Sequence, residues 1–271
     1  MPFGRQHGYT RRMRPREIDN TIYEAYGDRW YTAFDDPVAI LRAETRVKIP
    51  WIIGKLDGHF GHRDLQLLDV GCGGGFVSNA LSAHGIAQVT GIDLSPSSLD
   101  VARRWDRTAR VNYVIGDAYH LPMADSSFDC VTALDVLEHV ENPALVIKEC
   151  ARVLRPGGLF LFQTLNRNWV AGLVGIKFIE WFVRNTAPDM HLLRMFIKPA
   201  ELTRYCEDSG LRMQEITGIR PRFSTIPLKS YFERVVPEQL EFQLTRSRLL
   251  AYMGCAQKER DVYRALQPLD H

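Results

Sequence analysis

Short apolar runs alternate along the chain with segments whose apolar residues recur at helical spacing. The run 65–70 is followed by a glycine-rich turn and then by a helix-like segment over 77–84. Buried strands that alternate with helices are typical of a parallel sheet covered on both faces. Further strand-like runs follow at 87–93, 111–115, 127–134, 159–164, 211–218 and 250–258. The pattern predicts an α/β fold with a doubly wound, mostly parallel sheet of seven strands.

Other segments do not fit this alternation and divide the chain into parts. Residues 17–34 carry an apolar side chain at every fourth position from Ile18 to Trp30, which predicts an amphipathic helix, and 38–53 is read as a second helix. We expect both helices to cap a cleft at the sheet. The predicted parts are a basic arm at 1–16, a single domain at 17–258 with a lid at 166–197 and an insertion at 220–249, and a tail at 259–271.

The turn after the first strand carries the clearest candidate chemistry. It has the pattern Asp69-x-Gly71-x-Gly73-x-Gly75, and Asp93 ends the next strand. Glycines allow close approach of a ligand to the backbone, and an acidic residue about 20 positions later suits ribose hydroxyls. The pattern lacks the sixth-position glycine of a dinucleotide fingerprint, and Asp69 would repel a pyrophosphate. S-adenosylmethionine, which carries an ammonium and no phosphate, fits better, and the alternative is a turn without a ligand.

Residues at the ends of the next strands extend this predicted cofactor site. Leu94 follows Asp93 directly, and Asp117 and Ala118 follow the third strand. Ligands of open α/β sheets bind at the carboxyl ends of the strands. We therefore expect the Asp117 carboxylate and the Ala118 backbone N–H to contact an adenine ring; the alternative for Asp117 is a helix cap.

Composition narrows the partners and the compartment. The formal net charge is +2, which argues against a nucleic-acid partner, and the arginines within 1–16 form a solvated terminus or touch an anionic membrane. No apolar run follows these arginines, so we expect no signal peptide. The cysteines are odd in number, widely spaced and without a C-x-x-C pair, which favours reduced packing residues in a cytoplasmic protein.

The segment from Trp169 to Val183 is almost entirely apolar. It is shorter than the roughly 20 residues that a membrane-spanning helix needs. Tryptophan and basic residues lie among its apolar residues and directly after them, as is typical of helices that lie at a lipid surface. The segment is therefore interpreted as a contact with a membrane surface, and the alternative is a buried helix over the substrate site.

Together these motifs resemble the class I S-adenosylmethionine-dependent methyltransferases, and more closely the ubiquinone-biosynthesis O-methyltransferases. The resemblance rests on the glycine turn and on the segments 137–140, 154–158, 164–168 and 196–202. It implies a Rossmann-like fold with N-terminal helices and methylation of a phenolic hydroxyl on a hydrophobic small molecule. It also implies peripheral association with the inner membrane, and cofactor contacts at Arg46, Gly71, Asp93 and Leu134.

The resemblance further implies a divalent cation, Mg²⁺ or Zn²⁺, held by Asp135, Glu138 and His139. On a helical turn these residues would share one face, and such a metal would lower the pKa of a bound hydroxyl. The alternative is that Glu138 and His139 close the turn beside the cofactor. The candidate catalytic residues are His139, Glu138 and His191. The two histidines are the candidate general bases, because histidine exchanges a proton near neutral pH.

Competing functions remain open at this level. The insertion at 220–249 is longer than expected for the family, which keeps methylation of another small molecule, such as a natural-product phenol, in consideration. A protein of another class, a non-catalytic module that binds the cofactor or a lipid, is a further alternative. The intact Asp69, Gly71, Gly73 and Asp93 argue that the cofactor is still bound.

Overall fold

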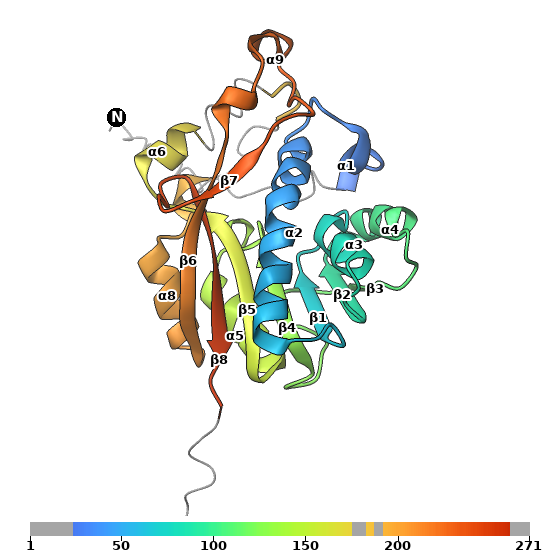
Figure 1. The fold of residues 1–271 in the computed structure, drawn as a ribbon, viewed down its shortest axis with the longest axis vertical. Helices are drawn as coiled ribbons and strands as arrows, with labels where there is room; N and C mark the ends of the chain where they lie inside the picture. The colour runs from blue at the N-terminus through green and yellow to red at the C-terminus, as the bar shows by residue number, and fades with distance from the viewer. Residues whose placement is uncertain (1–23, 175–182, 187–191, 261–271) are drawn as a thin grey trace, which may run out of the picture.

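One mixed sheet forms the centre of the molecule. The structure is a computed structural model that describes residues 24–174, 183–186 and 192–260. The strands are β1 (Gln66–Val70), β2 (Gln88–Asp93), β3 (Asn112–Ile115), β4 (Phe128–Leu134), β5 (Leu154–Leu165), β6 (Leu211–Pro221), β7 (Phe242–Thr245) and β8 (Ala251–Lys258). Their order in the sheet is β3-β2-β1-β4-β5-β8-β6-β7 (Figure 1). The first five pair in parallel and the last three are antiparallel, which confirms the predicted α/β class.

The sheet has one strand more than the sequence predicted. The extra strand is β7, which lies in the insertion at 220–249 and pairs with the end of β6, Gly218 opposite Thr245. Its four residues alternate between apolar and polar, a pattern too short to stand out within a polar and aromatic stretch. The insertion thus continues the sheet instead of forming a separate loop.

Helices cover both faces of the sheet. They are α1 (Arg29–Thr32), α2 (Val38–Phe60), α3 (Phe76–Ala83), α4 (Pro96–Trp105), α5 (Pro143–Val153), α6 (Trp169–Gly172), α8 (Pro199–Glu207) and α9 (Leu228–Glu233), with short 3₁₀ turns η2 (Leu137–His139), η4 (Leu193–Met195) and η5 (Phe223–Thr225). Neighbouring strand residues face opposite layers: Leu67 packs with α2 and α3, and Leu68 packs with α5 and α8.

The N-terminal helices differ from the prediction. Within the described part of 17–34 the α-helix is confined to α1, because Gly27 has a left-handed φ of 49° that interrupts the chain before it. The second helix, α2, is longer than predicted and continues to Phe60, where Gly61 with φ 70° ends it. This long helix lies over one face of the sheet, and its upper end in Figure 1 lies beside β7 of the insertion.

The apolar segment 169–183 is described only in part. Trp169 begins α6, whose N-terminus is capped by the Asn168 side chain, which accepts from the Ala171 N–H at 2.9 Å. Residues 175–182 of this segment lie outside the described residues, as do the arm 1–16 and most of the tail. Among the residues that the structure does describe, no helix is long and apolar enough to cross a membrane.

Candidate active site

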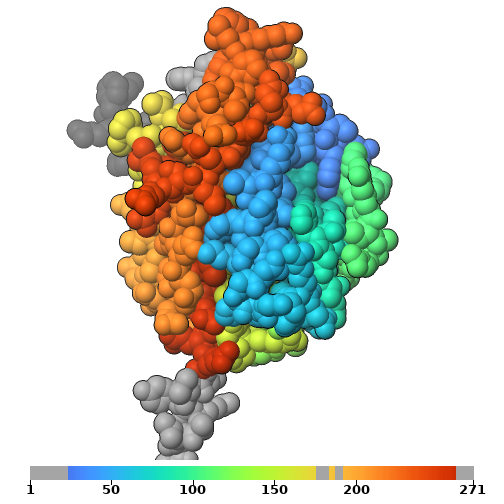
Figure 2. Space-filling view, viewed as in Figure 1, coloured from blue at the N-terminus to red at the C-terminus, as the bar shows by residue number. Residues whose placement is uncertain are grey.

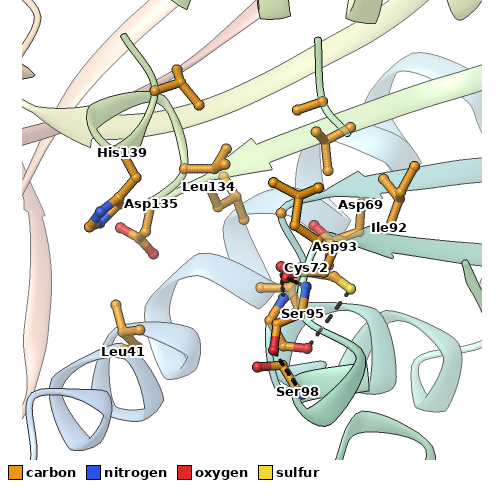
Figure 3. Close-up of a pocket in the computed structure, with 18 of the residues that line it drawn as sticks. Leu41, Asp69, Cys72, Ile92, Asp93, Ser95, Ser98, Leu134, Asp135 and His139 are labelled. Carbon is orange, nitrogen blue, oxygen red and sulfur yellow. Dashed lines mark hydrogen bonds between the residues drawn. The ribbon is translucent and has the colours of Figure 1, made fainter. Parts of the chain in front are cut away.

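A large cavity opens at the carboxyl ends of the parallel strands, where open α/β sheets bind ligands. It has a volume of about 740 Å³ and is lined by the loops after β1, β2, β3 and β4 and by one side of α2. In Figure 3 the Asp93 and Ser95 cluster lies at one end, and Asp135 and His139 lie at the other. A single cavity therefore joins the predicted cofactor residues to the candidate base.

The glycine turn needs its glycines for steric reasons. Gly71 has φ 70°, and a Cβ at this position would lie 2.5 Å from a Val136 methyl group. Gly73 has φ 49°, and its N–H donates to Asp93 Oδ2 at 2.8 Å. The N–H of Ser95 donates to Asp93 Oδ1 at 2.9 Å. Asp93 thus fixes the turn while its carboxylate lines the cavity, and burial raises its pKa.

Asp69 lies in the cavity wall, but its carboxylate is engaged differently from the prediction. Ser78 donates to one oxygen at 2.6 Å, and Thr132 donates to the other at 2.7 Å. Only 3% of the residue is exposed, and burial raises its pKa to about 6. These bonds tie the start of α3 to β1 and β4. The predicted role of Asp69, attraction of a ligand ammonium, stays a prediction beside this structural role.

The predicted adenine end is assembled by the strand ends. Leu94, Asp117 and Ala118 all line the cavity, and Leu134 lines its floor. Leu94 is 65% exposed, unusual for a leucine beside a buried strand, so an apolar face is available to a planar ring. Asp117 Oδ1 also accepts from the Tyr119 N–H at 2.9 Å, which closes a turn; the alternative of a helix cap is wrong, because the chain between β3 and β4 forms no helix. The binding roles of these residues stay predictions.

Arg46 does not lie where the prediction placed it. It is not among the residues that line the cavity, and its Nη2 donates to the carbonyl of Glu238 in the insertion at 2.9 Å. The reason is helical geometry, since two residues along α2 correspond to a rotation of roughly 200°. Lys48 is the basic residue of α2 that lines the cavity.

Lys48 belongs to a buried polar network that the sequence analysis missed. Its ammonium forms an ion pair with Glu44 at 2.6 Å and a second one with Asp135. Gln163 Nε2 donates to Glu44 at 3.0 Å and to Asp135 at 2.7 Å. Lys48 is 1% exposed, and the two carboxylates raise its pKa against the opposing effect of burial. A Glu–Lys pair at i, i+4 is visible in the sequence, but only the packing of α2 shows that it is buried.

The predicted metal site is wrong for the described part of the chain, where no group of histidine, cysteine and carboxylate side chains could hold a metal ion. Asp135 has a left-handed φ of 56° and the residues after it form the 3₁₀ turn η2, so the assumed helical face does not exist. The Asp135 side chain turns to Lys48 and Gln163, whereas Glu138 accepts from Thr164 Oγ1 at 2.8 Å. The Lys48 ammonium supplies the positive charge at Asp135 that a metal would supply.

The candidate catalytic residues are placed differently from one another. His139 lines the cavity beside Asp135 and Val140, as Figure 3 shows for the labelled pair His139 and Asp135. Glu138 does not line the cavity, because its side chain is 2% exposed and bonded to Thr164 behind η2. His191 lies outside the described residues. Of the two candidates that the structure describes, His139 is therefore the one that lines the cavity, and its catalytic role stays a prediction.

Burial of Glu138 predicts a pH-dependent stability. Burial, and next the charge of Asp135, raise its pKa from 4.5 to about 8. Because the folded state holds this proton more tightly than the unfolded state, its contribution is full below pH 4.5 and is lost as pH rises to about 8. The unfolding free energy of Glu138→Gln minus that of wild type should therefore increase by on the order of 3 kcal/mol from pH 5 to pH 9.

Urea unfolding of both proteins across this pH range measures the difference. Glu207→Gln, at an exposed position near the end of α8, is the matched control and should keep a difference of about zero at every pH. A Glu138→Gln difference that does not change with pH would show that the carboxyl stays charged in the folded protein.

Comparisons with known proteins agree with this geometry. Residues 68–162 match the methyltransferase domain family. A ubiquinone biosynthesis O-methyltransferase from Coxiella burnetii is 39% identical over 192 residues, which cover 70% of this chain and 76% of that protein. The corresponding protein from Azoarcus sp. is 39% identical over 64% of this chain and 73% of its own length. The one from Xanthomonas oryzae pv. oryzae is 35% identical over 75% of this chain and 83% of its own length.

Solved structures show the same fold. A methyltransferase from Bacillus halodurans has a TM-score of 0.56 and 22% identity and covers 79% of this chain and 98% of its own. The [4+2]-cyclase SpnF has a TM-score of 0.54 and 18% identity and covers 77% of this chain and 80% of its own. A cyclase among these neighbours means that the fold alone does not define the reaction.

The fold, the cavity with its glycine turn and the matched domain define a class I S-adenosylmethionine-dependent methyltransferase. Within that class, the identity of 35–39% to relatives of which the chain covers three quarters or more identifies the family. The chain belongs to the ubiquinone biosynthesis O-methyltransferase family.

Proposed function

We propose that this protein transfers a methyl group from S-adenosylmethionine to a phenolic hydroxyl of a hydrophobic, ubiquinone-precursor-like catechol. One observation carries the proposal: a single cavity runs from Asp93 and Asp117 to His139. The nucleoside end and a candidate base thus face each other across one continuous space. The relatives named for ubiquinone biosynthesis support the choice of acceptor.

The residues of the cavity fit the proposed methyl donor. Asp93 offers a carboxylate at the end of β2, where ribose hydroxyls are bound in such folds, and Leu94 offers an apolar face. Gly71 and Gly73 line the cavity, and Val136 and Trp30 pack where a side chain at these two positions would lie. When bound, S-adenosylmethionine supplies a methyl group on a positively charged sulfur.

The other end of the cavity fits the removal of a proton from the acceptor. A phenol has a pKa near 10, so it is a poor nucleophile at neutral pH until the proton is taken. His139 is the neutral-pH base that lines this end, and it accepts the proton as the oxygen bonds to the methyl carbon and the carbon–sulfur bond breaks. Lys48 lies in the same wall, where its ammonium pairs with Asp135 and so offsets the negative charge of a carboxylate that lines this end of the cavity.

The proposed location is the cytoplasmic surface of a membrane. Trp169 is 76% exposed and Leu173 is 50% exposed, and large apolar side chains in contact with water favour a lipid surface. A hydrophobic acceptor would be concentrated at that surface, close to the segment that follows β5.

Methyl-transfer assays with S-adenosylmethionine and a panel of catechols of increasing tail length, with and without liposomes, test the function. We expect kcat/KM to rise with tail length, and we expect the same turnover after EDTA treatment as before, because the described residues offer no metal site. A protein that is stabilised by S-adenosylmethionine in a thermal-shift assay but methylates no catechol would overturn the acceptor, and loss of activity on chelation would overturn the metal-free site.

A further inference from the structure

A second, smaller cavity lies beside the first and is almost wholly apolar. It has a volume of about 130 Å³, and among the described residues that line it only Glu44, Ser230 and Tyr231 are not apolar. We call it the insertion pocket, because most of its wall comes from the insertion at 220–249. The residues that characterise this wall are Ile226, Val235, Val236, Leu240 and Phe242.

The insertion is fixed in place around this pocket. Val236 N–H donates to the Phe34 carbonyl at 2.6 Å, and Arg46 Nη2 donates to the Glu238 carbonyl at 2.9 Å. Val236 and Leu240 pack with Ala39 and Ala43 of α2 in one buried cluster. In Figure 2 the orange residues of the insertion lie directly against the blue residues of α2. The pocket is therefore a built feature of the fold.

The insertion pocket and the cofactor cavity adjoin along α2. Leu41, Thr45 and Lys48 face the cofactor cavity, whereas Ile40 and Glu44 face the insertion pocket. Lys48 lines one cavity and Glu44 lines the other, so their ion pair, at 2.6 Å, lies between the two cavities. The strands agree: Asp135 follows β4 and lines the cofactor cavity, and Leu165 ends the neighbouring β5 and lines the insertion pocket.

The chemistry of the pocket selects an uncharged hydrocarbon. Glu44 disfavours an anion such as a phosphate, and few polar groups are available to a polar ligand. Empty cavities lower stability in proportion to their volume, so a retained apolar cavity needs an explanation. An apolar cavity of about 150 Å³ stays dry and holds a benzene-sized molecule, so this one matches one short isoprenoid-sized unit.

We propose that the insertion pocket binds one isoprenoid-sized unit of the hydrocarbon tail of the methyl acceptor while the ring lies at His139 in the adjoining cavity. This inference rests on the proposed function, because it takes the acceptor to be a tailed phenol. The proposal gives the insertion a role: the insertion selects the acceptor by its tail, whereas the glycine turn binds the methyl donor. Acceptor recognition then depends on residues far in sequence from the methyltransferase motifs.

Filling the pocket tests the proposal. Ile226→Trp places a large ring at a half-buried wall position, and Val236→Phe does so deeper in the pocket. Each should lower kcat/KM for a farnesyl catechol about tenfold or more, mainly through KM, and leave 4-methylcatechol unchanged. The control is Leu228→Trp, which adds similar bulk at a residue that is 72% exposed and does not line the pocket; it should change neither value in assays without lipid.

A binding measurement separates this inference from the proposed function. Calorimetric titration with farnesol should show binding to wild type and to Leu228→Trp, and at least tenfold weaker binding to Ile226→Trp and Val236→Phe. If farnesol binds in this way but no catechol is methylated, the pocket stands and the proposed function fails. If catechols are methylated but the filled variants act on both substrates as wild type does, the tail lies elsewhere and this inference fails.

Discussion

Replacing His139 with alanine is expected to lower turnover at least 100-fold while the affinity for S-adenosylmethionine changes little. General-base catalysis by a positioned side chain contributes about 10²–10⁴-fold, and His139 is the histidine that the described part of the chain brings to the acceptor end of the cavity. The affinity should persist because Asp93, the predicted ribose ligand, lies at the opposite end of the cavity (Figure 3). Single-turnover rates measure the first effect, and calorimetry measures the second.

A pH profile distinguishes a base from a packing residue. In wild type kcat/KM should rise with pH, because an imidazole accepts a proton only in its neutral form. The His139→Ala profile should instead follow the hydroxyl of the substrate, and more acidic catechols should recover part of the lost rate. His84→Ala, at an exposed position at the end of α3, is the control and should behave as wild type. Equal loss of turnover and of cofactor affinity in His139→Ala would assign it a structural role.

The sequence predicted the arrangement around the glycine turn better than the arrangement around Asp135 and His139, and there is a physical reason. The donor end is local: a strand, a glycine turn and a carboxylate at the next strand end bring Gly71, Gly73 and Asp93 together by connectivity alone. No packing information is needed to place them. The predicted number of strands was wrong only because it omitted β7, since a strand of four residues shows too little periodicity to be recognised.

The acceptor end depends on contacts between distant segments. Lys48, Asp135 and Gln163 come from α2, from the loop after β4 and from β5, and only the packing of α2 across the sheet brings them together. The same packing decides that Lys48 and not Arg46 lines the cavity. The metal prediction assumed a helical turn at 135–139, but the backbone of Asp135 is left-handed, so its side chain does not share a helical face with Glu138 and His139.

Replacing Lys48 with methionine is expected to lower the free energy of unfolding by about 3–5 kcal/mol, because breaking a buried ion network from one side leaves uncompensated charge. Methionine keeps most of the apolar stem but leaves Glu44 and Asp135 without their shared cation. Gln163 Nε2 would be the donor that these two carboxylates still share. Urea unfolding at pH 8 measures the loss.

The matched control lies about two turns further along the same face of α2. Lys55 is also ion-paired, with Glu215, but their side chains are 30% and 41% exposed, so Lys55→Met should cost less than about 1 kcal/mol. Equal losses in the two variants would mean that the Lys48 network is no stronger than a surface pair.

The pH dependence of the Lys48→Met loss identifies its cause. Burial already raises the pKa of Glu44, and removal of the Lys48 charge should raise it further. A carboxyl whose pKa is raised in the folded state stabilises that state at low pH and loses the contribution as pH rises, so the loss in Lys48→Met should be smaller at pH 5 than at pH 8. Adding Glu44→Gln to Lys48→Met should recover part of the stability at pH 8, because it removes one unpaired buried charge. A loss that is constant with pH and unaffected by Glu44→Gln would indicate that packing of the lysine stem, and not its charge, holds α2 against the strand ends.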